Sequence, residues 1–262
     1  MSVRLGAVQY LNARPLVYGL DADPQFTVRF DIPSRCAELL HAHEIDLGLI
    51  PSIEYLRGPR SYGIVPGPAV ASMGAVASVA LYSRRDLRDV RTIAMDTSSK
   101  TSVALTLVVV KRTCGTVPQS IPAAPDLAAM LATADAALMI GDNALLLEAP
   151  AGVQKIDLGQ LWTDMTGLPF VYAFWAGWPR AVTPEQVGRL ERARDEGVAH
   201  IDDIARGFAA GDPQRELVAS RYLRDNIQYE LQTDGLTTFY RYAAEDGLVD
   251  FDGSLNFYHA DR

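Results

Sequence analysis

The sequence predicts an α/β protein of two lobes, which are joined by two crossing strands and followed by a helical C-terminal segment. Two successive series of alternating strand and helix patterns predict the lobes, because such alternation favours mostly parallel sheets with right-handed crossovers. Two long β-prone apolar runs, residues 76–82 and 170–175, are placed to carry the chain between the lobes. From Thr183 onward the apolar residues recur at helical spacing, which predicts the final helical segment.

The first series of strands and helices precedes residue 58. Short apolar runs predict the strands, and apolar residues at helical spacing predict the helices. Pro15 lies near the first turn of its helix, where the missing N–H costs nothing. The expected elements are a strand at residues 5–11, a helix from Asn12, a strand at 26–32, a helix at 36–43, a strand at 45–50 and a short helix at 53–56.

The second series begins after residues 58–74, which are rich in Pro and Gly and are expected to form a loop or an edge strand. Its expected elements are a strand at residues 92–95, helices at 101–112 and 124–133, a strand at 135–140 and a helix from 144. The helical segment is expected to hold helices from Pro184, at 215–227 and at 237–244. We therefore expect residues 1–82 and 177–262 to form lobe one, and residues 83–176 to form an inserted lobe two.

Composition restricts the partners and the compartment. The chain has 262 residues, of which 48% are hydrophobic, so it can bury a sizeable core. A formal net charge of −8 argues against nucleic acid and anionic membrane surfaces as partners. Cys36 and Cys114 have no metal-ligand spacing and are expected to be reduced thiols. The first strand starts without an apolar signal segment before it, and no run has transmembrane length, so we expect a cytoplasmic protein.

The segment Thr-Ser-Ser-Lys-Thr-Ser at residues 97–102 is the strongest candidate for a binding site. It carries five hydroxyls and one cation at the junction where a strand is expected to turn into a helix. The first N–H groups of a helix lack internal partners and carry the positive end of its dipole, so such a junction attracts a carboxylate or a phosphate. A phosphate-binding Walker loop needs glycines before the Lys, and this segment has none. Simple N-capping is the alternative interpretation.

Small polar residues recur where the expected strands end. Asn12, Ser52, the segment 97–102 and Asp142 each follow a strand, and Ser78 lies on a crossing strand. Open α/β sheets bind ligands at the carboxyl ends of their strands, so we expect these groups to face a small anion in the cleft between the lobes. Each of them taken alone is equally consistent with a helix cap.

The sequence gives little support to a metal site, to a catalytic site that uses His, or to a nicotinamide or flavin site. His41 and His43 do not share one face of a helix, and no third metal ligand is suggested nearby. No His falls at an expected strand-to-helix junction, and the Gly-x-Ser-x-Gly and Gly-x-Gly-x-x-Gly patterns are absent. We therefore expect neither a metal nor a nicotinamide or flavin cofactor.

Several segments together resemble one family, the chorismate dehydratases of the futalosine route to menaquinone. These segments are residues 8–16 (VQYLNARPL), 45–52 (IDLGLIPS), 77–79 (ASV), 96–103 (DTSSKTSV), 138–144 (LMIGDNA), 157–162 (DLGQLW) and 166–175 (TGLPFVYAFW). The resemblance weakens after Trp178. One departure is Lys100, which stands where the family pattern has Arg, so the charge is kept but the bidentate fork is lost.

The resemblance implies a periplasmic-binding-protein-like fold of the second type, used as an enzyme. It implies loss of water from chorismate, a small dianion, to give 3-(1-carboxyvinyloxy)benzoate in menaquinone biosynthesis, with no cofactor or metal. Asn12 and Ser78 are the expected catalytic residues, which orient the enolpyruvyl group and the leaving oxygen. The base is either Asp142 or a carboxylate of the substrate. The expected substrate-binding residues are Ser52, Ser98, Ser99, Thr101, Ser102, Gly141 and Asp142.

Two alternative functions share the predicted fold. A binding protein for a carboxylate solute would carry the same Ser/Thr cluster and return its ligand unaltered. A 1,4-dihydroxy-6-naphthoate synthase of the same pathway is the second alternative, and the segments 97–102 and 166–170 favour the dehydratase over it. The sequence does not fix the oligomeric state.

Overall fold

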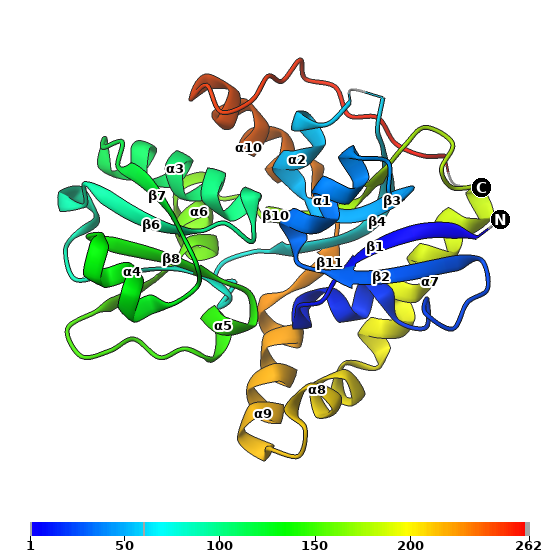
Figure 1. Cartoon of the computed structure of the whole chain (residues 1–262), viewed down its shortest axis with the longest axis horizontal. Helices are drawn as coiled ribbons and strands as arrows, with labels where there is room; N and C mark the ends of the chain where they lie inside the picture. Colours follow the sequence, from blue (N-terminus) through cyan, green and yellow to red (C-terminus); the bar gives the residue numbers. More distant parts are fainter. Residues whose placement is uncertain (1, 60, 260–262) are drawn as a thin grey trace.

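The fold has two lobes, each built on its own β-sheet, in a computed structural model that describes residues 2–59 and 61–259. One sheet has the strand order β11-β4-β10-β3-β1-β2, and the other has the order β7-β6-β8-β5-β9. Figure 1 shows the two sheets side by side, with helices packed around each of them. The expected two-lobed α/β class is confirmed, although both sheets also contain antiparallel pairs.

Lobe one begins with parallel strands. β1 pairs with β2 on one side and with β3 on the other, in parallel. Every residue of β3 is buried, as its continuous apolar run predicts. The elements are β1 (Val3–Val8), the 3-10 helix η1 (Leu11–Val17), β2 (Phe26–Asp31), α1 (Pro33–His41), β3 (Leu47–Pro51), α2 (Ser52–Arg57), β4 (Gly63–Ser72) and β10 (Phe170–Gly177).

Lobe two has a sheet whose central strands, β6 and β8, run parallel to each other. Its longest helix, α3, starts after the capping residue Ser99 and ends at Gly115, whose φ of 68° suits a residue without a Cβ. The elements are β5 (Val79–Ser83), η2 (Leu87–Asp89), β6 (Thr92–Asp96), α3 (Lys100–Cys114), β7 (Gln119–Ala123), α4 (Leu127–Thr133), β8 (Ala136–Ile140), α5 (Gly141–Leu146), β9 (Gln154–Asp157) and α6 (Leu158–Thr166).

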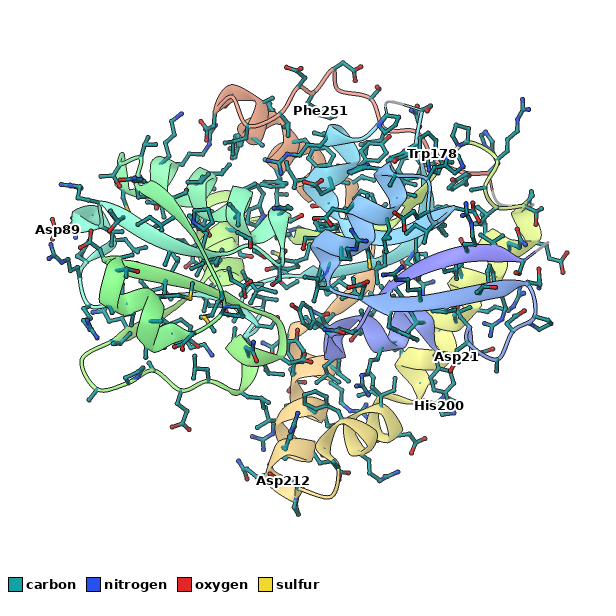
Figure 2. All side chains as sticks on the ribbon, in the orientation of Figure 1. Asp21, Asp89, Trp178, His200, Asp212 and Phe251 are labelled. Atoms are coloured by element: carbon teal, nitrogen blue, oxygen red, sulfur yellow. The ribbon has the colours of Figure 1, made fainter. Side chains whose placement is uncertain are left out.

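The C-terminal segment is mainly helical and returns to lobe one. Thr183 and Gln186 form a reciprocal capping box that begins the first of its helices. Figure 2 labels Asp212 at the tip of the hairpin of α8 and α9, which projects away from both sheets. The elements are α7 (Pro184–Ala199), α8 (Ile201–Ala209), α9 (Pro213–Arg221), a single π-helical turn η3 (Tyr222–Asn226), β11 (Gln228–Glu230) and α10 (Thr233–Glu245).

We expected the lobe boundaries to follow residue 82 and to precede residue 177. The strands at these two boundaries belong to other sheets than that division implies. β5 pairs with β8 and β9 in the second sheet, and β10 pairs with β3 and β4 in the first. The chain therefore passes between the lobes in residues 73–78 and 167–169. A β-prone run indicates that a strand forms, but it does not reveal the partner, so the boundary depends on tertiary contacts.

Two further expectations differ from the structure. Residues 58–74 contain the ten-residue strand β4, which lies between β11 and β10 and is not an edge. Its neighbour β11 comes from the far end of the chain, which local composition cannot indicate. The helix expected at 215–227 ends at Arg221 and gives way to the π-helical turn.

Both lobes contribute to one continuous apolar core. Side chains of β1 and β3 pack into the same cluster as side chains of β6, β8 and α3. Trp162 of α6 packs edge-on against Phe170 of β10 and Phe239 of α10, so this aromatic group joins the lobes and the tail. In the part of the chain that the structure describes, no helix is long and apolar enough to cross a membrane.

Candidate functional site

A cavity lies where the two lobes meet, at the ends of strands from both sheets. The empty space among its lining atoms is about 460 Å³, counting the part that opens to solvent. The polar side chains of its lining belong to Tyr10, Asn12, Ser78, Ser99, Ser102 and Tyr172. The remaining lining residues are Val8, Ala13, Pro33, Leu49, Pro51, Val70, Val79, Ile140, Gly141 and Ala173.

The start of α3 contributes Ser99 and Ser102 to this lining. The Ser99 hydroxyl accepts the Ser102 N–H at 3.4 Å, as an N-cap does, and the Ser102 hydroxyl donates to Ser99 at 3.1 Å. Both residues are buried in the cavity wall. The N-terminal end of a 15-residue helix therefore faces the cavity and makes its surroundings favourable for an anion. Lys100 is the first residue of α3 but is not part of the lining.

Ser98 is half-buried, has partners in both lobes and does not line the cavity. Its hydroxyl donates to Asp96 at 2.6 Å and accepts from the Tyr10 hydroxyl at 3.2 Å. Its carbonyl accepts the Ser34 N–H at 3.0 Å. Because Tyr10 and Ser34 belong to lobe one, Ser98 holds the two lobes together.

Ser52 and Thr101 form a second bridge between the lobes. Their hydroxyls lie 3.3 Å apart, and the Thr101 hydroxyl also accepts the Ile53 N–H at 3.2 Å. Thr101 thereby caps the first turn of α2 from the opposite lobe. The Ser52 hydroxyl donates to the Val171 carbonyl at 2.8 Å. Both side chains are fully buried and lie outside the lining.

Gly141 and Asp142 begin α5 at the end of β8. Gly141 lines the cavity with a φ of 65°, and a Cβ there would stand 3.1 Å from the Tyr10 ring. The Asp142 carboxylate accepts the Leu11 N–H at 3.0 Å and is not part of the lining. Burial raises the pKa of Asp142, and the hydrogen bond from Leu11 partly opposes this shift.

Ser78 and Asn12 meet the cavity from different parts of the chain, since Asn12 lies in η1 of lobe one and Ser78 lies in the connection before β5. Ser78 is 1% exposed and follows Ala77, whose positive φ of 63° is a costly conformation for a residue with a Cβ. The Asp157 carboxylate holds this turn by accepting the N–H groups of Val76 and Ala77 at 3.0 and 2.7 Å. The Ser78 hydroxyl is therefore presented by a constrained backbone.

Two tyrosines of the lining were missed by the sequence reasoning, although both lie in the segments that carry the family resemblance. Tyr10 follows β1, and Tyr172 lies on β10, with its hydroxyl 3.1 Å from that of Ser72. Burial raises the pKa of both phenols, so both stay neutral near pH 7. The polar side chains of the cavity lining are therefore two neutral phenols, three serine hydroxyls and the Asn12 amide.

The histidines lie away from the cavity lining. His41 contacts Tyr62 and Glu54, while His43 stacks on Trp178 and His200 stacks on Tyr18. Among residues 2–59 and 61–259, no group of three His, Cys, Asp or Glu side chains is placed to hold a metal ion.

Comparison with known proteins identifies the family. The menaquinone biosynthesis family matches residues 3–245. The chain belongs to this family. A chorismate dehydratase of Thermus thermophilus is 33% identical over 245 residues, which cover 87% of this chain and 89% of the relative.

Solved structures show the same fold at low sequence identity. A protein of Archaeoglobus fulgidus superposes with a TM-score of 0.74 at 18% identity, over 95% of this chain and 98% of its own. An alkanesulfonate-binding protein of Xanthomonas axonopodis gives 0.67 at 16% identity, over 95% and 94%. A Candida albicans protein described as having the generic periplasmic binding protein fold gives 0.67 at 11%, over 100% and 99%. This member of the menaquinone biosynthesis family therefore has the periplasmic-binding-protein-like fold.

Proposed function

We propose that this protein is a chorismate dehydratase, which removes water from chorismate to give 3-(1-carboxyvinyloxy)benzoate in menaquinone biosynthesis. The observation that carries the proposal is the 33% identity to a chorismate dehydratase over nearly nine-tenths of both chains. The interlobe cavity supports it, because neutral hydroxyl donors and a helix N-terminus suit a small dianion. A cytoplasmic location is part of the proposal and is tested by cell fractionation.

Substrate binding is assigned to the start of α3. One carboxylate of chorismate would accept hydrogen bonds from Ser99 and Ser102, with the helix dipole adding to the attraction. Apolar residues of both lobes, such as Leu49 and Ile140, would pack against the ring and exclude water from it. The bridges made by Ser98 and Thr101 would hold the lobes closed around the ligand.

The reaction breaks one C–H bond and one C–O bond of neighbouring ring carbons. A base takes the proton from the ring carbon that bears the enolpyruvyl ether, and the electron pair forms the new double bond as the C–O bond of the neighbouring carbon breaks. The leaving hydroxide takes up a proton from the protonated base, so that one water is released and the base is regenerated. The product ring is aromatic, so most of the driving force is intrinsic, and the protein has to fix one conformer and stabilise the leaving oxygen. Asn12 and Ser78 carry these roles in the proposal, since both line the cavity.

We assign the base to a carboxylate of the substrate itself. No His lines the cavity, and its tyrosines stay neutral. The Asp142 carboxylate already accepts the Leu11 N–H and lies outside the lining. A carboxylate of the bound substrate could act as the base without any further protein group.

The first experiment incubates the purified protein with chorismate and follows loss of one water by mass spectrometry and formation of the aromatic ring by ultraviolet absorbance. Asn12→Ala should lower kcat/KM about 100-fold, the usual cost of removing one preorganised polar group. Asn143→Ala is the matched control, because Asn143 is exposed on the neighbouring α5. Chorismate returned unaltered by the wild type would indicate a binding protein, and a wild-type rate in Asn12→Ala would remove Asn12 from the mechanism.

A further inference from the structure

We propose that Tyr222 is a positioning residue, which fixes the direction in which the Ser78 hydroxyl donates its proton into the cavity. This inference rests on the proposed dehydratase function. It concerns a residue of the C-terminal segment, beyond the short motifs that carry the family resemblance in the sequence. Tyr222 is not part of the cavity lining and would act through the lining residues that it contacts.

The contact between the two hydroxyls is short and buried. The Tyr222 hydroxyl donates to the Ser78 hydroxyl oxygen at 2.7 Å, across 144 positions of sequence. Tyr222 is 2% exposed and Ser78 is 1% exposed, so water does not compete for this bond. With its oxygen accepting from Tyr222, the Ser78 hydroxyl has its own proton free for an acceptor inside the cavity.

Tyr222 stays protonated near pH 7 and can therefore act as a donor. Burial raises the pKa of its phenol well above the ordinary value of 10, and contacts with Ser78 and Asn12 oppose the shift only in part. A phenol that never ionises near pH 7 keeps its proton for Ser78. The contact with Asn12 also brings both proposed catalytic residues to the same phenol.

The backbone around both residues is held in place from two directions. Tyr222 and Asn226 are the first and last residues of the π-helical turn, a rare element that is frequent at functional sites. The Asn226 side-chain amide donates to the Ala75 carbonyl at 2.8 Å. Both ends of this turn therefore make a hydrogen bond to the segment that presents Ser78. From the other lobe, Asp157 holds the N–H groups of Val76 and Ala77.

The contact with Tyr222 would set the direction of the Ser78 proton during the reaction. A hydrogen bond from Ser78 stabilises the substrate hydroxyl as its C–O bond breaks, and that bond requires the Ser78 proton to point at the leaving oxygen. Without Tyr222, the Ser78 hydroxyl would rotate among its staggered positions and would spend part of its time as an acceptor. Tyr222 itself touches no reacting atom.

The kinetic test compares two tyrosine-to-phenylalanine variants. Tyr222→Phe should lower kcat about 10-fold or more and change KM less than about threefold, because the bond to Ser78 matters in the transition state and not for binding. Tyr229→Phe is the matched control: its hydroxyl is buried in the same segment and has no hydrogen-bond partner among the described residues. Equal kcat in Tyr222→Phe and wild type would overturn the inference, as would a loss confined to KM.

A structural test separates this inference from the proposed function. A neutron diffraction structure of Tyr222→Phe should show the deuterium of the Ser78 hydroxyl spread over more than one position, with the segment around it unchanged. A single deuterium position identical to that of the wild type would overturn the inference whether or not chorismate is turned over. A wild type that does not dehydrate chorismate would instead remove the proposed function, and the crystallographic result would still decide how Ser78 is oriented.

Discussion

At the scale of single residues, the hydroxyl cluster of residues 97–102 divides into two groups with different surroundings. Ser99 and Ser102 face the cavity at the start of α3. Ser98 and Thr101 point into contacts between the lobes, where Tyr10 and Ile53 are their partners. Sequence could count these hydroxyls, but successive residues at the start of a helix point in different directions, so only the tertiary structure assigns each one a neighbour.

Thr101→Val and Ser102→Ala should separate the two groups. Thr101→Val leaves the buried Ile53 N–H without its acceptor and should lower the free energy of unfolding by about 1–3 kcal/mol in urea titrations. Ser102→Ala should change the free energy of unfolding by less than about 1 kcal/mol and weaken chorismate binding in calorimetry. Thr101→Ser, which keeps the hydroxyl, is the control. Unchanged chorismate affinity in Ser102→Ala would remove the anion site from the start of α3.

Asp142 makes the stability depend on pH in a direction opposite to that of most carboxylates. Its pKa in the folded protein is raised above the ordinary value of 3.8, mainly by burial, so the folded state binds the proton more tightly than the unfolded state. The contribution of Asp142 to stability is therefore fullest at low pH and falls as the pH rises from 3.8 through the raised pKa.

Asp142→Asn should keep the hydrogen bond from Leu11 and remove the loss of stability that the wild type shows as the pH rises. The variant should gain stability relative to wild type as the pH rises from about 4 to 7, as measured by urea unfolding across that range. A constant difference at every pH would contradict the raised pKa. The same variant tests the base, because turnover close to wild type supports the substrate carboxylate, whereas a loss of about 100-fold or more supports Asp142.

At the scale of elements, the sequence predicted the buried strands and the capped helices well. β2 and β8 lie within one residue of their expected positions, and β3 within two. Every residue of β3 and β8 is buried, which requires continuous apolar runs, whereas β2 is largely exposed or half-buried. The short strands β7, β9 and β11 were not predicted. Their residues are largely exposed or half-buried, and they become strands only because a neighbouring strand offers hydrogen bonds.

Close packing between elements gives a further prediction. A Cβ on Gly197 of α7 would stand 2.2 Å from the Pro15 carbonyl oxygen of η1, whereas a Cβ on Gly207 of α8 would meet nothing within 4 Å. Gly197→Ala should therefore lower the free energy of unfolding by about 1–3 kcal/mol. Gly207→Ala, the matched helical control, should raise it by about 0.5–1 kcal/mol. Equal changes in the free energy of unfolding for the two variants, measured in urea, would show that α7 can shift away from η1 to make room for the added Cβ.

At the scale of the whole molecule, the interlobe cavity depends on contacts between distant parts of the chain. Leu11 of lobe one donates to Asp142 of lobe two, and Tyr222 of the tail reaches Ser78 in the connection between the lobes. The sequence predicted that strand ends would meet at a cleft, and five of the nine expected site residues line the cavity: Asn12, Ser78, Ser99, Ser102 and Gly141. The other four, Ser52, Ser98, Thr101 and Asp142, lie beside it with protein partners.

The sequence by itself determined the two-lobed α/β class, the order of the buried elements and the family resemblance, because these depend on local periodicity and on short motifs. Only the tertiary structure decided which sheet received β5 and β10, which hydroxyls faced the cavity and which tyrosines joined them. The physical reason is that strand pairing and side-chain contact are made between residues far apart in the chain. Such contacts, like the one between Tyr222 and Ser78, leave no periodic trace in the sequence.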